Sequence, residues 1–92
     1  MEVDFTGCEV RRAGLRVDLS ALEFKLLTVF VRNRGRVLTR DQLLDAAWGR
    51  GVSLNDRVVD NHIVSLRRKL ESDPTQPRHF LNLRGLGYRF DA

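Results

Sequence analysis

The sequence has too few cysteines and histidines for a disulfide or a metal centre. Its single cysteine, Cys8, cannot form a disulfide within the chain, which suits a reducing compartment. One cysteine and two well-separated histidines, His62 and His79, cannot supply a tetrahedral metal set without carboxylates. We therefore expect neither a metal site nor any other cofactor.

Long apolar runs are also missing. None approaches the ~20 residues that a membrane-spanning helix needs, and the N-terminus lacks the basic-then-apolar pattern of a secretion signal. These absences predict a cytoplasmic protein without a membrane partner.

The motifs of common enzymes are absent as well. The sequence has no phosphate-binding loop and no nucleophile elbow. Asp60, His62 and Ser65 fall within one predicted helix, where their side chains project in directions too different for a catalytic triad. We expect no enzymatic activity.

What is present is one folded, basic domain over residues 1–92. A chain of 92 residues is long enough for a single core, and 42% hydrophobic with 30% charged residues is typical of globular proteins. The net charge of +4 is unevenly spread: residues 1–20 carry three cations and four anions, and the other 72 carry thirteen and eight. A positive later part suits a polyanionic partner, although many basic domains bind nothing acidic.

The first 19 residues contain three short segments with strand character, at 3–6, 9–12 and 15–19, separated by Gly7-Cys8 and Ala13-Gly14. Leu15, Val17 and Leu19 alternate with polar residues, which predicts a strand with one buried side. We expect a small antiparallel sheet over residues 1–19.

Two capping boxes mark the starts of helices. Ser20 with Glu23 opens a helix that ends at residues 33–35, and Thr39 with Gln42 opens a short helix that runs to about Trp48. The apolar residues of these two helices are expected in the core: Leu22, Leu26, Leu27, Val29, Phe30, Leu43, Leu44 and Ala47.

A third helix, predicted over about 55–71, has two different faces. Four apolar residues recur at the spacing i, i+4, i+7, i+11 and form a core stripe: Val59, Ile63, Leu66 and Leu70. The opposite side carries cations, an amide, a hydroxyl and small apolar groups: Arg57, Val58, Asn61, Val64, Ser65 and Arg68. A DNA major groove offers a partner to each of these groups, because it presents phosphates, base edges and thymine methyls.

A proline-containing loop and two strand-like runs complete the chain. Residues 79–83 and 87–90 are joined by Arg84-Gly85-Leu86, where glycine allows a tight hairpin. A sheet over 1–19, three helices over 20–72 and a hairpin over 79–91 predict an α+β winged helix-turn-helix domain, with the hairpin as the wing.

Six sequence blocks, at residues 22–27, 37–44, 47–49, 56–63, 66–70 and 84–90, carry a resemblance to a known family. The chain resembles the C-terminal winged-helix DNA-binding effector domain of bacterial OmpR/PhoB-type two-component response regulators. The resemblance implies a four-stranded N-terminal sheet, a recognition helix in the major groove and a wing arginine in the minor groove. It also implies a phosphorylatable receiver domain that precedes this domain in the full-length protein.

The resemblance and the helix pattern together predict the DNA contacts. The residues expected to contact bases are Val58, Asn61, Val64, Ser65 and Arg84. Asn61 can pair with adenine, and the valines can contact thymine methyls. The alternative for the four helix residues is an ordinary exposed helix face, and the alternative for Arg84 is a residue of a surface turn. Some relatives place an arginine at the position of Ser65, so their preferred DNA sequences cannot be transferred to this chain.

Contacts to the DNA backbone are expected from a second set: Trp48, Arg57, His62, Arg67, Arg68 and Tyr88. Each has a structural alternative. Arg57 can pair with Asp60, His62 can pack between the faces, and the rings of Trp48 and Tyr88 can serve the core. Arg67 leans toward the core flank, and charge runs are usually solvated.

The resemblance also implies a surface for RNA polymerase, formed by the loop Gly49, Arg50, Gly51, Val52, Ser53 and Leu54. The sequence alone predicts only a helix connector there.

The leading hypothesis is therefore sequence-specific binding of double-stranded DNA for transcription regulation, by a cytoplasmic protein that is associated with the nucleoid when it binds DNA. An isolated domain is expected to be a monomer that binds DNA as a dimer, on half-sites about one helical turn apart. The alternative is a winged-helix protein-interaction module that does not bind DNA, which would bind no duplex even at low salt.

Overall fold

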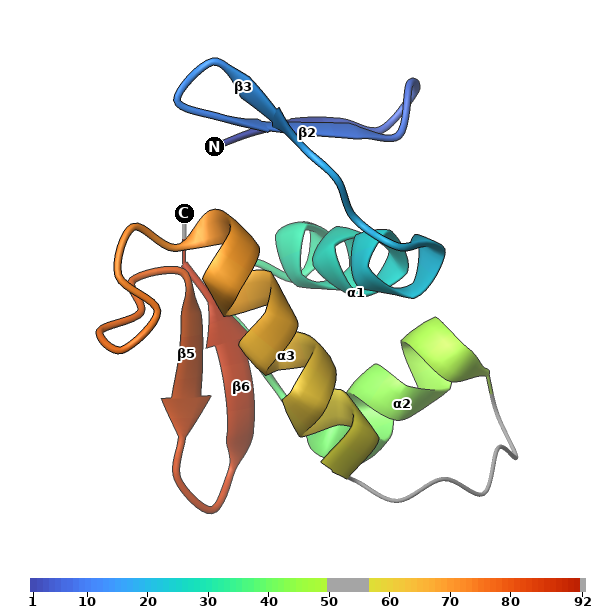
Figure 1. The fold of residues 1–92 in the computed structure, drawn as a ribbon. Helices are drawn as coiled ribbons and strands as arrows, with labels where there is room; N and C mark the ends of the chain where they lie inside the picture. The colour runs from blue at the N-terminus through green and yellow to red at the C-terminus, as the bar shows by residue number, and fades with distance from the viewer. Residues whose placement is uncertain (50–56, 92) are drawn as a thin grey trace.

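The computed structural model describes residues 1–49 and 57–91 and has the predicted order of strands, helices and hairpin (Figure 1). The predicted helix start at residues 55 and 56, and residues 50–54 of the predicted polymerase loop, lie outside this range. The elements in chain order are β1 (Glu2–Asp4), β2 (Glu9–Arg12), β3 (Leu15–Val17), α1 (Ala21–Arg32), β4 (Val37–Leu38), α2 (Arg40–Trp48), α3 (Arg57–Leu70), β5 (Phe80–Leu83) and β6 (Gly87–Phe90).

The N-terminal sheet is antiparallel, with strand order β1-β2-β3. Val10 in the central strand is buried and pairs with Val3 on one side and Val17 on the other. The three strands predicted over residues 1–19 are confirmed, and the fourth strand that the resemblance implies is not among the described residues. The prediction that Leu15 lies on a buried side is wrong. Leu15 is 74% exposed because it forms the last pair of the β2–β3 ladder, at the open end of the sheet.

Both predicted capping boxes are confirmed. At α1, the Ser20 hydroxyl accepts from the Glu23 N–H at 3.1 Å and the Glu23 carboxylate accepts from the Ser20 N–H at 2.8 Å. At α2, Thr39 and Gln42 make the same pair of bonds, at 3.1 and 2.9 Å. These contacts satisfy backbone donors that the first turn of a helix leaves without an intrahelical partner.

The core lies between the three helices and the second sheet. All four residues of the predicted α3 stripe are buried, and so are Leu26, Leu27, Phe30, Leu43, Leu44 and Ala47, whereas Leu22 and Val29 are half-buried. Three aromatic rings meet at the sheet: the Phe30 ring centroid lies 5.5 Å from that of Phe80, and the Phe80 centroid lies 5.2 Å from that of Phe90. Such edge-to-face and tilted contacts are the preferred packing of aromatic side chains.

The second sheet contains the predicted wing. Its order is β4-β6-β5, so the short strand after α1 joins the C-terminal hairpin. Gly87 opens β6 with φ +143, and a Cβ there would collide with the Leu38 carbonyl oxygen of β4. Glycine is therefore needed for the hairpin to approach β4 this closely.

A buried carboxylate at the end of α3 fixes the start of the hairpin. Glu71 accepts hydrogen bonds from the backbone N–H groups of Arg78 at 3.0 Å, His79 at 2.9 Å and Phe80 at 2.9 Å. Burial raises the pKa of the Glu71 carboxyl, but these N–H donors outweigh burial and hold the pKa below its ordinary value.

Candidate nucleic-acid interface

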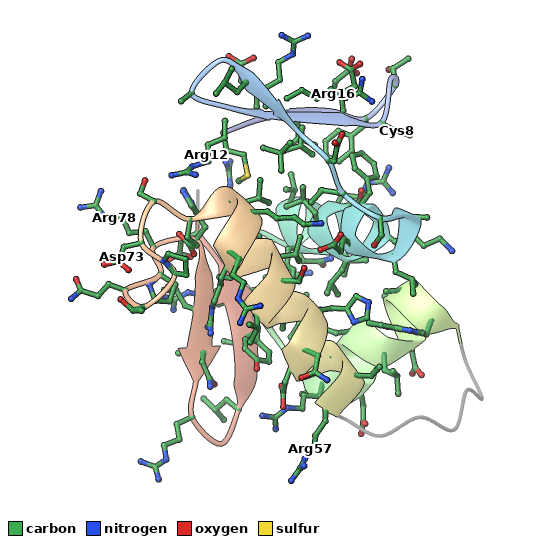
Figure 2. All side chains as sticks on the ribbon, viewed as in Figure 1. Cys8, Arg12, Arg16, Arg57, Asp73 and Arg78 are labelled. Carbon is green, nitrogen blue, oxygen red and sulfur yellow. The ribbon has the colours of Figure 1, made fainter. Side chains whose placement is uncertain are left out.

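The start of α3 and the turn of the β5–β6 hairpin lie on the same side of the molecule, opposite the N-terminal sheet (Figure 1). Figure 2 shows Arg57 projecting away from the protein at the first turn of α3, whereas Arg16 lies on the opposite side, on the N-terminal sheet. This arrangement brings the predicted recognition helix and the predicted wing to one surface.

The outer face of α3 carries a narrow exposed stripe. Arg57, Asn61, Val64 and Arg68 are all exposed and follow the spacing i, i+4, i+7, i+11. This stripe is shifted by two residues, or about 200° around the axis, from the buried stripe. Val64 is 42% exposed, although apolar residues usually avoid such positions on a helix. Within the described residues, the side chains of Asn61 and Arg68 make no hydrogen bond or ion pair.

Two residues beside this stripe are used by the fold itself. Val58 is half-buried and packs against the core. Ser65 is half-buried too, and its hydroxyl donates to a Glu23 carboxylate oxygen of α1 at 2.5 Å. Both were predicted to contact bases, and a contact of either residue with a base stays a prediction.

Glu23 joins α1 to the recognition helix. Besides its capping bond, it accepts from Ser65 and, at 2.7 Å, from the Lys69 ammonium. Burial raises the pKa of this carboxyl, but hydrogen bonds from Lys69, the Ser20 N–H and Ser65 outweigh burial and lower the pKa to about 2. Glu23 is therefore a charged residue throughout the physiological range.

Asp60 joins three elements beside the interface. Its Oδ1 accepts from Arg40 at the start of α2 at 2.8 Å and from the Tyr88 hydroxyl of β6 at 2.6 Å. Burial raises the pKa of the Asp60 carboxyl, but the bonds from Arg40 and Tyr88 and the positive charges of Arg40 and Arg57 lower it overall. Asp60 thereby links α2, α3 and the wing.

Tyr88 and Arg67 support the wing from the inside. Burial, followed by the bond to Asp60, raises the pKa of the Tyr88 hydroxyl, so that this buried group remains a donor. Arg67 donates twice to the Phe80 carbonyl oxygen, at 2.8 and 3.0 Å, and its guanidinium lies 6.0 Å from the centre of the Tyr88 ring. Both residues thus make the inward-facing contacts of their alternative role, and their contacts with the DNA backbone stay predictions.

His62 and Trp48 pack against each other, with ring centroids 4.9 Å apart and the rings perpendicular. The His62 Nδ1 lies 2.8 Å from the Val58 carbonyl oxygen, so Nδ1 carries the proton that is donated there. Trp48 is half-buried against the core, as its alternative role predicts. A contact of either ring with a phosphate stays a prediction.

The wing turn exposes the predicted minor-groove arginine. Arg84 is exposed and is followed by Gly85, whose φ of +79 suits glycine. Leu86, 64% exposed, closes the turn through its N–H, which donates to the Leu83 carbonyl at 2.8 Å. The turn borders a hollow that it shares with the start of α2, lined by Thr39, Arg40, Asp41, Asn82, Leu83, Gly85, Leu86 and Gly87.

Residues 1–49 and 57–91 contain no group of three or more His, Cys, Asp or Glu side chains that can hold a metal ion. None of the described helices has the length and apolar character required to cross a membrane.

The family model described as "Transcriptional regulatory protein, C terminal" matches residues 14–90. The chain belongs to this family. Among curated relatives, the KDP operon transcriptional regulatory protein KdpE of Escherichia coli K12 is 41% identical over 88 residues, which cover 96% of this chain and 39% of that protein. The transcriptional regulatory protein KdpE of Mycobacterium tuberculosis is 39% identical over 90 residues, covering 98% of this chain and 40% of that protein. The chain thus spans about two fifths of the length of these relatives.

Solved structures of the family agree with the fold. The response regulator DrrB of Thermotoga maritima, an OmpR/PhoB homolog, superposes with a TM-score of 0.90 at 37% identity, over 98% of this chain and 41% of that one. The RstA DNA-binding domain of Klebsiella pneumoniae, in complex with the RstA box, gives a TM-score of 0.86 at 32% identity, over 97% of this chain and 88% of that one. The predicted OmpR/PhoB-type winged helix is confirmed. The predicted function class, a DNA-binding domain of transcription regulators rather than an enzyme, is that of the family.

The sequence analysis did not find the residues that connect α3 and the wing to the rest of the fold. Glu23 was recognised only as a capping residue, because its other two partners, Ser65 and Lys69, lie more than 40 positions away in the chain. Asp60 and Arg40 carried one usable signal: an acidic residue on the otherwise basic side of α3 requires a cationic neighbour. Glu71 carried none, since its partners are backbone N–H groups.

Proposed function

We propose that this chain binds double-stranded DNA sequence-specifically, with α3 in the major groove and the β5–β6 hairpin at an adjacent minor groove. One observation carries the proposal: α3 bears the exposed stripe Arg57, Asn61, Val64 and Arg68, and the first turn of this helix lies on the same side of the molecule as the wing turn. A cation at each end, with an amide and an apolar group between them, matches the order phosphate, base edges, phosphate across a groove.

The dimensions of the stripe support this orientation. Eleven residues separate Arg57 from Arg68, so their Cα atoms lie about 16 Å apart along the helix. The major groove of B-DNA is about 12 Å wide, and the two long guanidinium side chains can therefore reach phosphates on its opposite walls. Asn61 and Val64 then face the floor of the groove.

The wing supplies the second contact. Arg84 is an exposed cation at the turn of a hairpin that is fixed to α3 through Arg67, Glu71 and Asp60. A narrow minor groove has an enhanced negative potential that attracts arginine. Arg84 therefore favours sites with an A·T-rich step beside the sequence that α3 reads.

The salt dependence of binding to a duplex selected from a random pool tests this assignment. Each phosphate contact contributes about 0.9 to the slope of log affinity against log salt, so Arg57→Ala and Arg68→Ala should each lower the slope by roughly one. Arg16→Ala is the matched control, because it removes the same charge on the opposite side of the molecule (Figure 2). Equal slopes for all three variants would contradict the proposed docking, and a chain that binds no duplex at low salt is a protein-interaction module instead.

We further propose that the domain is the effector part of a longer response regulator, since the chain spans only about two fifths of its KdpE relatives. In that protein a receiver domain precedes it, two copies bind neighbouring half-sites, and residues 49–54 contact RNA polymerase. Gly49, which caps α2 with φ +103, is the only one of those loop residues within the described range. Analytical ultracentrifugation should show a monomer without DNA and two copies on a duplex with two half-sites.

A further inference from the structure

The outer face of α3 offers fewer side chains for base reading than its sequence suggests. The Ser65 hydroxyl is not free to contact a base, because it donates its proton to Glu23, a residue of α1 that is only 4% exposed. The same carboxylate holds the Lys69 ammonium and the Ser20 N–H, so its two oxygens are held by three donors from two elements. A serine that turned toward a base would leave a buried, charged acceptor with a missing donor.

The Val58 side chain is kept from the bases for a different reason. Its side chain is half-buried and packs against the core cluster, and the His62 ring closes over its backbone by bonding to the Val58 carbonyl oxygen. Turning Val58 outward would remove apolar contact area from the core. Two exposed side chains remain between the cations of the stripe, namely Asn61 and Val64.

We infer that α3 reads bases with only these two side chains, Asn61 and Val64, and that its half-site contains an adenine with a thymine methyl one or two base pairs away. The inference rests on the proposed binding to DNA and deepens it. An amide pairs bidentately with the N6 and N7 atoms of adenine, and the thymine methyl is the apolar group that the major groove offers to a valine.

The spacing of the two residues sets the spacing of the two bases. Residues at i and i+3 of a helix have Cβ atoms about 5–6 Å apart, and stacked bases rise by about 3.4 Å per step. Asn61 and Val64 can therefore contact bases that are one or two base-pair steps apart. The Ser65 position contributes no base preference, so reading by α3 ends at Val64.

Single-atom changes in the DNA test the Val64 contact. A half-site selected from a random pool is synthesised with each thymine replaced in turn by deoxyuridine, which removes the methyl group and keeps the pairing edge. Burial of one methyl group is worth about a fourfold change in affinity, so one position should bind the unaltered protein about fourfold more weakly. Val64→Ala should bind both versions of that position equally, as a double-mutant cycle would show.

A second probe tests the Asn61 contact. Replacing adenine by 7-deazaadenine removes the N7 acceptor and one of the two hydrogen bonds, which should weaken binding by about two- to tenfold at one position. Asn61→Ala should be insensitive to that replacement. The two sensitive positions should lie one or two base pairs apart.

Ser65→Ala is the matched control for base reading. The variant should select the same DNA sequence as the unaltered chain, because the lost hydroxyl serves Glu23, and its circular dichroism spectrum verifies that it folds. The inference that only Asn61 and Val64 read bases is wrong if Ser65→Ala changes the base preference, or if binding is selective without any deoxyuridine-sensitive position. Either result leaves the proposed DNA binding intact. Absence of binding to every duplex at low salt overturns both.

Discussion

Both sheets of the molecule have three short antiparallel strands, yet they are joined to the helices in different ways. The second sheet buries Phe80, Tyr88 and Phe90, whereas among the strand residues of the first sheet only Val10 is buried. A strand with buried aromatic residues contributes several times the apolar contact of a strand with one buried valine. The hairpin that we propose as the wing is therefore part of the core.

The polar contacts also join the second sheet to the helices more than the first. The ion pairs of the first sheet, from Glu9 to Arg11 and Arg16 and from Arg16 to Asp18, stay within that sheet and are 3.8–4.0 Å long. The ion pair of the second sheet, between Arg89 and Asp91, is also local. Its hydrogen bonds, however, reach the side chains of Arg67 and Glu71 at the end of α3 and of Asp60 near its start. The hairpin is therefore fixed relative to α3, as the contact with two grooves that we propose requires.

The largest expected effect comes from truncating one phenylalanine in each region. Phe80→Ala should lower the free energy of unfolding by about 3–5 kcal/mol, because a fully buried ring that contacts Phe30 and Phe90 is replaced by a cavity. Phe5→Ala should cost about 1 kcal/mol or less, since this ring is 40% exposed and contacts Phe24 at a centroid distance of 6.3 Å. Urea denaturation followed by circular dichroism measures both, and equal losses would refute the contrast between the two regions.

Glu71→Gln tests the polar attachment of the wing. The variant should lower stability by about 2–3 kcal/mol at neutral pH, because an amide provides one acceptor oxygen and no charge for three backbone N–H groups. The folded-state pKa of Glu71 lies below its ordinary value of 4.5, so this contribution is complete above that value and is lost as the pH falls through the lower folded-state pKa.

Amide NMR shifts show which backbone groups are affected when acid protonates the Glu71 carboxylate. The N–H signals of Arg78, His79 and Phe80 should move together as the pH falls through the lowered folded-state pKa of Glu71. In Glu71→Gln the three signals should no longer follow the titration of this carboxyl. A coincident transition of both sheets in the unaltered chain would contradict a separate carboxylate attachment.

Local patterns were sufficient to predict most of the fold. Capping boxes define helix starts through neighbours three residues apart, and the α3 stripe follows from helical periodicity, so both were predictable. Leu15 was not, because strand alternation indicates which residues share a face but not whether the rest of the protein covers that end of the strand. The three strands of the first sheet were predictable from three extended segments, whereas a fourth strand was implied only by the resemblance.

The candidate site was predictable as a face but not as a set of contacts. The helical period placed Arg57, Asn61, Val64 and Arg68 together, and the structure has them exposed on one line. The partners of Ser65, Arg67 and Tyr88 are set by tertiary packing between residues 13–42 positions apart in the chain. Such contacts leave no periodic signal in the sequence.

A smaller effect is expected at the junction of the wing with α3. Tyr88→Phe removes the hydroxyl that donates to Asp60 at 2.6 Å and should lower stability by about 1–2 kcal/mol, since the acceptor is charged and partly buried. Combining it with Asp60→Asn in a double-mutant cycle should give a clear coupling energy, because the two side chains share one hydrogen bond. Strictly additive losses in thermal or urea denaturation would show that the junction does not depend on this bond.

The smallest effect is expected at the open end of the first sheet. Leu15→Ser should change the stability of the isolated domain by less than about 0.5 kcal/mol, because a side chain that is 74% exposed loses little apolar contact when it becomes polar. Val10→Ala in the neighbouring strand is the matched control and should cost about 2 kcal/mol, since Val10 is the buried residue of that sheet. Urea denaturation of the two variants separates the cases. A loss at Leu15 as large as that at Val10 would mean that the first sheet is covered along its whole length, and the contrast with the wing would no longer hold.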